Sequence, residues 1–217
     1  MIVSARYNEL RARVAELRRH LLPGQFLPTG DYTDRQMDRA RGYRILVHAE
    51  IESYLEDVVK EVITDSIRIW KDDRKPSSLL ISFLASYHSG WNVNDEISNQ
   101  EIIQMAKSRK NIKDSVNEII DSAQRQFSVI ISANHGVREK NFKTLILPTG
   151  VDIEELDQTW LTNLDNFGSL RGQVAHNAKR TTDQINPKDE YNNVTALLKG
   201  LKDLDILLLK QKQTAST

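Results

Sequence analysis

The sequence has no cysteine among its 217 residues. This absence excludes disulfide bridges, thiolate metal sites and cysteine nucleophiles, and it fits the reducing cytoplasm that we predict as the location of the protein. The chain also has only 5 prolines and 9 glycines. These numbers are too low for a disordered chain or for a β protein with many turns.

Long apolar runs and an excess of charge are absent as well. No apolar run approaches the roughly 18 residues of a membrane span, and residues 1–22 carry charges throughout, unlike a signal peptide. We therefore expect no membrane association. Acidic and basic residues balance at 30 each, which argues against bulk attraction to nucleic acid but allows a local basic groove. Without a His-Glu-x-x-His motif, a glycine-rich phosphate loop or an acidic cluster, we expect neither a metal nor a cofactor.

The sequence is rich in apolar residues at helical spacing. Helices are predicted over 2–22, from 33 or 34 to about 70 with a kink at Gly42, over 79–87 and 99–132, from 157 or 159 through 167–180, and from 187 onward. Residues 138–147 and 152–156 are expected to be short helical or irregular segments. No stretch alternates long enough for a strand. We predict an all-α bundle of about six helices with additional short helices, forming a single domain over residues 1–217, with an N-terminal helix and linker at 1–32 and a core at 33–217.

Three short segments carry the chemistry of chain turns. Leu-Pro-Thr-Gly occurs at 27–30 and again at 147–150, and because the flanking residues differ we interpret both as turns and not as a repeat. Asn134-His-Gly136 resembles a helix C-cap in which glycine supplies the left-handed conformation. His135 is then expected to be a cap residue, whereas His48 is expected to be a packed or hydrogen-bonded core histidine.

The stretch Phe167-Gly-Ser-Leu-Arg-Gly-Gln-Val-Ala-His-Asn-Ala-Lys-Arg180 is the most informative part of the chain. Helical spacing places one arginine within an apolar stripe, whose members are Trp160, Leu164, Phe167, Arg171, Val174 and Ala178. A guanidinium in such a stripe needs a water-filled cleft, a place at the edge of the stripe, or an acceptor such as Glu50 or Glu52.

Two glycines four residues apart, Gly168 and Gly172, lie inside this predicted helix. Each costs about 1 kcal/mol relative to alanine, so they indicate the close approach of another backbone, from the same chain or from a second subunit. His176 follows Arg171 by five residues, which sets the two side chains about 140° apart on one helix. To act on the same phosphate, the pair needs either a helix that ends near His176 or a second copy of the motif.

An arginine followed by histidine after four to six residues is a weak pattern, because the chain contains it three times: Arg13 with His20, Arg41 with His48, and Arg171 with His176. The setting favours the third. Its arginine lies in an apolar stripe beside a face of small residues. Asn177, Lys179 and Arg180 follow directly and are candidates to hold an RNA backbone, although a basic helix end also suits the helix dipole.

Five segments between about residues 40 and 180 share a likeness with one group of helical proteins. They are Phe167-Gly-Ser-Leu-Arg-Gly-Gln-Val-Ala-His176, Asn134-His-Gly-Val-Arg-Glu-Lys-Asn141, Leu147-Pro-Thr-Gly-Val151, Leu156-Asp-Gln-Thr-Trp160 and Val47-His-Ala-Glu-Ile-Glu-Ser-Tyr54. In their order and in the late Arg-x4-His motif, the sequence resembles the HEPN superfamily, and most of all the prokaryotic RiboL-PSP-HEPN subgroup.

This resemblance implies a metal-independent endoribonuclease of prokaryotic defence, toxin–antitoxin or abortive-infection systems, acting on RNA as a homodimer whose two motifs face one cleft. By position, Arg171 and His176 are the catalytic pair. One residue departs from the pattern, because Gly172 stands where active members often have a polar residue. The alternatives are therefore a non-catalytic helical module that binds RNA or a partner protein such as an antitoxin, and an antitoxin-like subunit associated with a nucleotidyltransferase.

Overall fold

The computed structural model describes the chain over residues 2–87, 112–176 and 185–213. Within these ranges the backbone forms α-helices and short 3-10 helices and no strand, which confirms the prediction of an all-α fold. The elements are α1 (Ala5–Leu21), α2 (Asp34–Asp73), α3 (Ser78–Tyr87), α5 (Ile112–Ser132), α6 (Glu139–Ile146), η1 (Leu147–Thr149), η2 (Ile153–Glu155), α7 (Gln158–His176) and α8 (Pro187–Gln213). In the described ranges no helix has the length and apolarity needed to cross a bilayer.

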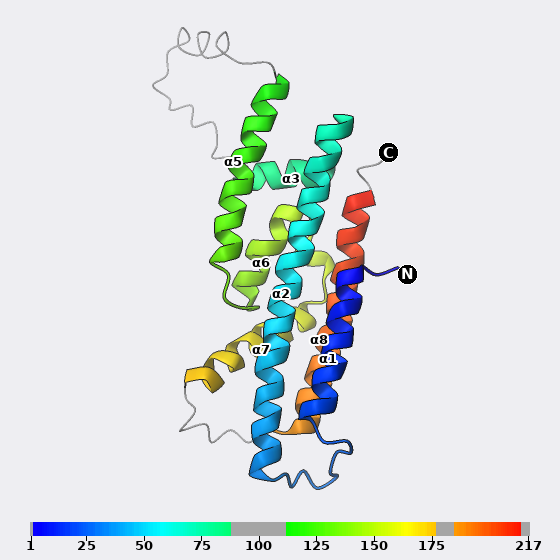
Figure 1. Cartoon of the computed structure of the whole chain (residues 1–217), viewed down its shortest axis with the longest axis vertical. Helices are drawn as coiled ribbons and strands as arrows, with labels where there is room; N and C mark the ends of the chain where they lie inside the picture. Colours follow the sequence, from blue (N-terminus) through cyan, green and yellow to red (C-terminus); the bar gives the residue numbers. More distant parts are fainter. Residues whose placement is uncertain (1, 88–111, 177–184, 214–217) are drawn as a thin grey trace.

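The long helix α2 is the element against which most of the others pack (Figure 1). It begins with a capping box, in which Thr33 and Gln36 each bond the other's backbone N–H, and it ends at Arg74, whose φ of 59° is left-handed. Its 40 residues make it about 60 Å long. The helix continues without a break through Gly42, where the sequence predicted a kink. Helices α1 and α8 run alongside α2, and α7 lies across it.

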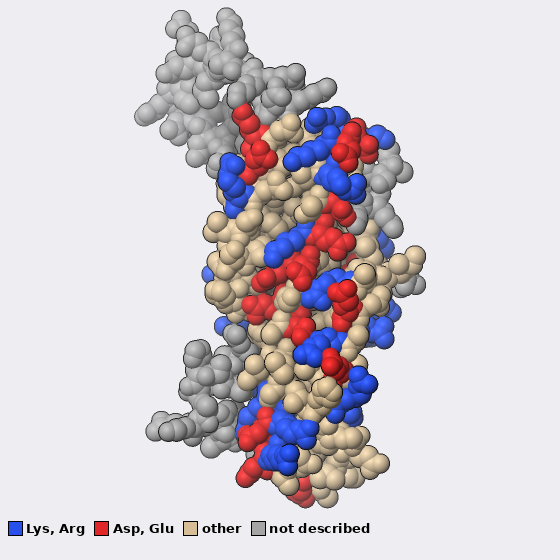
Figure 2. Space-filling view, viewed as in Figure 1, with Lys and Arg blue, Asp and Glu red and all other residues tan. Residues whose placement is uncertain are grey.

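The N-terminal helix α1 is fixed to its neighbours by apolar packing and by polar contacts. The buried Asp205 of α8 accepts hydrogen bonds from the Ser4 backbone N–H (2.7 Å), the Ser4 hydroxyl (2.6 Å) and the Tyr54 hydroxyl (2.9 Å). Ion pairs join α1 to α2, including Arg6 with Asp57 at 3.0 Å. Figure 2 shows acidic and basic side chains interspersed over the face that α1 and α2 form, so this face offers no patch of one sign to a polyanion.

The two Leu-Pro-Thr-Gly segments adopt the same turn, as predicted. In each, the glycine N–H donates to the carbonyl of the leucine three residues earlier, at 3.2 Å for Gly30 and 3.1 Å for Gly150. Both glycines are left-handed, with φ of 75° and 78°. The same prediction for Gly136 is wrong, because among the described glycines only Gly30 and Gly150 have positive φ. Gly136 is buried against α2 instead, where a Cβ would lie 4.0 Å from Nε2 of His48.

Candidate functional site

Helix α7 carries the Arg-x4-His motif on one continuous helix. Oδ1 of Asp157 accepts the backbone N–H groups of Thr159 (2.8 Å) and Trp160 (3.3 Å), so this carboxylate caps the helix start. The helix runs through His176, which sets the Cα atoms of Arg171 and His176 about 7.5 Å apart along the axis. Their side chains, and that of every residue from 170 to 176, lie outside the described set. Asn177, Lys179 and Arg180 lie outside it entirely.

The apolar stripe predicted on α7 is buried as far as it is described. Trp160, Leu164 and Phe167 are all in the core. The indole N–H of Trp160 donates to the Leu197 carbonyl of α8 at 3.1 Å, so the one polar atom of this large side chain is satisfied. These contacts fix α7 against α8 and α2 up to the residue four positions before Arg171.

Gly168 lies where another stretch of backbone approaches α7, as its place in the helix predicted. A Cβ at this position would lie 2.9 Å from Cγ and 3.0 Å from the backbone N of Arg138, closer than side-chain atoms pack. The approaching backbone belongs to the segment that begins α6, in the same chain. Gly172, the second glycine, lies among the residues whose surroundings are not described.

Asp165 joins the same segment to α7 through its charge. Its Oδ1 accepts the Glu139 backbone N–H at 2.9 Å and Nε of Arg138 at 3.3 Å. The bond from the Glu139 N–H, followed by the Arg138 guanidinium, lowers the pKa of this carboxyl from its ordinary value. Asp165 therefore caps α6, a role that sequence reasoning missed because its partners are 26 and 27 positions away.

Phe167, directly before Gly168, packs against His48 of α2. The two rings are stacked, with centroids 6.0 Å apart and planes at 25°, and His48 is only 1% exposed. Nδ1 of His48 lies 3.4 Å from Oε2 of Glu52, one turn further along α2. His48 is thus the packed core histidine that was predicted, and it contacts the turn of α7 directly before the motif.

A chain of polar contacts continues along α2 beside this histidine. Nδ2 of Asn134 donates to Oε1 of Glu56 at 2.8 Å, and Nδ2 of Asn141 donates to Oδ1 of Asn134 at 2.9 Å. His48, Glu52 and Glu56 occupy successive turns of one α2 face. Three of the segments quoted above, at 47–54, 134–141 and 167–176, thus meet at one place in the fold. Glu56 and Asn141 were not predicted, although Glu56 stands eight residues after His48 and four after Glu52, which is helical spacing.

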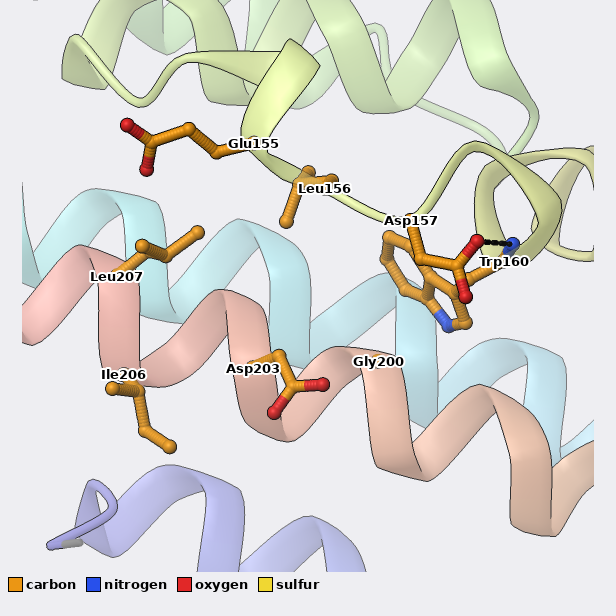
Figure 3. Close-up of a pocket in the computed structure, with 8 residues that line it drawn as sticks. All are labelled: Glu155, Leu156, Asp157, Trp160, Gly200, Asp203, Ile206 and Leu207. Carbon is orange, nitrogen blue, oxygen red and sulfur yellow. Dashed lines mark hydrogen bonds between the residues drawn. The ribbon is translucent and has the colours of Figure 1, made fainter.

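The described residues enclose several hollows of different chemistry. One of about 340 Å³ lies between η2, the start of α7 and α8 (Figure 3), where Glu155, Asp157 and Asp203 surround an apolar floor that includes Trp160. It contains no basic side chain, and its carboxylates repel phosphate. A second hollow, of about 630 Å³, follows α6 and includes Arg138, Lys140 and Lys143. Among the described residues, no three histidine, aspartate or glutamate side chains are grouped to hold a metal ion.

The helical fold, with an Arg-x4-His motif on α7 and polar contacts from α2 behind it, has the features of a HEPN-type protein. Residues 8–210, nearly the whole chain, match the RiboL-PSP-HEPN family. The chain belongs to the RiboL-PSP-HEPN family. Comparison with curated proteins and with solved structures gave no match.

Proposed function

We propose that this protein is a metal-independent endoribonuclease with Arg171 and His176 as its catalytic pair. The observation that carries the proposal is the attachment of α7 directly before the motif. Phe167 is held against His48 of α2, and Gly168 against the backbone of Arg138. A site that must keep two groups within a fraction of an ångström of a reacting phosphate benefits from such a rigid support.

The chemistry follows from what arginine and histidine can do at an RNA phosphate. The 2′-hydroxyl attacks the adjacent phosphorus, the 2′-O–P bond forms, and the bond from phosphorus to the 5′-oxygen breaks. His176 removes the proton of the 2′-hydroxyl or gives one to the leaving 5′-oxygen, and an imidazole with a pKa near ~6.5 suits either step. The Arg171 guanidinium stabilises the added charge of the phosphorane. The products are a 2′,3′-cyclic phosphate and a 5′-hydroxyl.

The active form in this proposal is a homodimer. On a continuous helix Arg171 and His176 diverge by about 140°, so one copy of the motif presents its two groups poorly to a single phosphate. A second copy that faces the first supplies the Arg171 or His176 side chain that the first copy cannot direct at the same phosphate. Membership of the RiboL-PSP-HEPN family supports a role in prokaryotic defence or a toxin–antitoxin pair, with an antitoxin or another defence protein as partner.

One residue favours a second candidate function. Gly172 follows the motif arginine at a position that is often polar in active relatives of this kind. The alternative is a HEPN module without catalytic activity, which binds RNA or a partner protein through the same helix. Both functions place nucleic acid or a partner protein at α7, so an assay of RNA cleavage is needed to distinguish them.

The test uses the purified full chain, single-stranded RNA and excess EDTA. We expect wild type to cleave RNA but not the DNA strand of the same sequence, with cyclic phosphate and 5′-hydroxyl ends identified by mass spectrometry. His176→Ala should lose at least about 100-fold in rate, the range that removal of a general acid or base gives. His135→Ala is the matched control, since His135 is exposed and outside the motif. Wild type that leaves every RNA intact would favour the non-catalytic module.

A further inference from the structure

A small cavity of about 210 Å³ lies between α7 and α8, directly before the motif-bearing end of α7. Three asparagines line it, Asn163 and Asn166 from α7 and Asn193 from α8, together with the buried side chains of Phe167 and Leu197. Pockets for drug-sized ligands measure about 300–1,000 Å³. The cavity is therefore suited to a ligand of one flat ring system.

The three amides have no hydrogen-bond partner among the described residues. Each of these asparagines is exposed, and none makes a side-chain hydrogen bond to another described residue. An asparagine amide offers a donor and an acceptor side by side. This pair matches the N7 acceptor and the N6 amino donor of adenine, which asparagine can contact with both atoms at once.

The floor of the cavity is apolar, as a base needs. Phe167 is stacked on His48 through one side of its ring, and Phe167 and Leu197 supply apolar surface to the cavity. Single-stranded RNA is recognised through unstacked bases that pack on such surfaces while polar groups contact their edges.

The charge of the cavity does not oppose RNA. Its one acidic residue, the buried Glu190, accepts hydrogen bonds from Nε and Nη2 of Arg44, so its charge is compensated. The larger hollow of Figure 3 differs, because no ion pair within the described residues compensates Glu155, Asp157 or Asp203. Between these two hollows, the one beside Phe167 is better suited to a polyanion.

The position of the cavity relates it to the proposed chemistry. Phe167 precedes Arg171 by four residues on α7, which corresponds to about 6 Å along the helix axis. A nucleotide next to the phosphate that Arg171 contacts can thus reach the asparagines with its base. We propose that this cavity is a nucleobase subsite for single-stranded RNA, selective for adenine. The subsite rests on the proposed RNA-directed function, but it requires binding only and not cleavage.

The test measures binding to strands that cannot be cleaved. Short fluorescent 2′-fluoro homopolymers of A, C and U lack the attacking hydroxyl, and anisotropy gives the dissociation constant of each for the full chain. We expect wild type to bind the A strand most tightly. Asn166→Ala and Asn193→Ala should each reduce the preference for A roughly tenfold, the order of one bidentate amide–base contact.

Asn192→Ala is the matched control, because Asn192 is exposed on α8 next to Asn193 but does not line the cavity. It should leave the preference unchanged, and thermal unfolding should be alike for all three variants. If wild type binds the three strands equally or not at all, or if Asn192→Ala acts like Asn193→Ala, the subsite is wrong. If the protein binds the A strand selectively but cleaves no RNA, the result supports the proposed subsite and contradicts the proposed nuclease activity.

Discussion

At the scale of single residues, Asp165 holds the start of α6 against α7. One of its oxygens accepts a backbone N–H from Glu139 and a guanidinium N–H from Arg138. Both partners favour the charged carboxylate, and its pKa is accordingly lowered. Because the interaction requires the negative charge, its contribution to stability depends on pH.

The sign of this dependence follows from the lowered pKa. The stabilisation by Asp165 is fully present above the unfolded-state pKa of about 4, and it is lost as the pH falls through the lower pKa of the folded state. We expect Asp165→Asn to unfold more easily than wild type at neutral pH by about 0.3–1 kcal/mol, because the amide oxygen still accepts the Glu139 N–H but lacks the negative charge that a helix start favours. In urea titrations this difference should shrink towards pH 3.

Asp203→Asn provides the control for general charge effects. Asp203 is exposed on α8, and its side chain forms no hydrogen bond with a described residue. It should change the free energy of unfolding little at either pH. A gap between Asp165→Asn and wild type that stays constant from pH 7 to pH 3 would contradict the charged cap.

Whether the role of a residue could be predicted from the sequence depends on how far along the chain its partners lie. His48, within Val47-His-Ala-Glu50, was predicted as a packed or hydrogen-bonded core residue, and it is buried. Asp165 could not be assigned, because the groups that it binds come from a distant segment. Gly136 was misjudged for a related reason. Its local sequence fits a left-handed cap, but its φ is not positive and it is buried beside Asn141 and His48.

At the scale of elements, Gly168 and Gly42 are both glycines inside helices, with opposite surroundings. A Cβ on Gly168 would meet the backbone of Arg138 at 3.0 Å, whereas a Cβ on Gly42 would have no neighbour within 4 Å among the described atoms. The contact between α7 and the segment before α6 therefore depends on one glycine, while the long helix α2 does not need the other.

The two alanine variants should accordingly change stability in opposite directions. Gly168→Ala should lower the free energy of unfolding by about 1–3 kcal/mol, because the added methyl group overpacks a backbone contact. Gly42→Ala should raise it by up to about 1 kcal/mol, the difference in helix propensity. Urea unfolding followed by circular dichroism measures both. Equal effects at the two sites would mean that α6 and α7 do not approach closely in solution.

Element boundaries were predictable where a local signal sets them. Thr33, one of two cap candidates with Asp34, caps α2 in a capping box with Gln36. Asp157, one of two candidates with Thr159, caps α7. The length of α2 was harder to predict, since Gly42 permits a kink without requiring one. The sequence of residues 138–147 fits either a short helix or an irregular segment. Helix α6 forms there, and Asp165 of α7 caps it.

At the scale of the whole molecule, the proposed chemistry requires one phosphate to meet both Arg171 and His176. The sequence alone indicated the divergence of the two residues, because it follows from the helical period. It could not indicate what packs against α7, since His48 comes from α2 and Arg138 from the segment before α6, both distant from α7 in the chain. That support fixes the helix within one copy, and in the proposed dimer the second copy completes the site.

Mixing two inactive variants tests this composite site directly. Arg171→Ala and His176→Ala should each be inactive alone, while a dimer containing one of each retains one intact arginine and one intact histidine. If the two groups act from different copies, the mixture should regain cleavage of RNA, below the wild-type rate because some dimers pair identical chains. Light scattering should show dimers for all three proteins, and dilution should lower the activity per chain by mass action. A monomer that retains full activity on dilution would contradict the composite site.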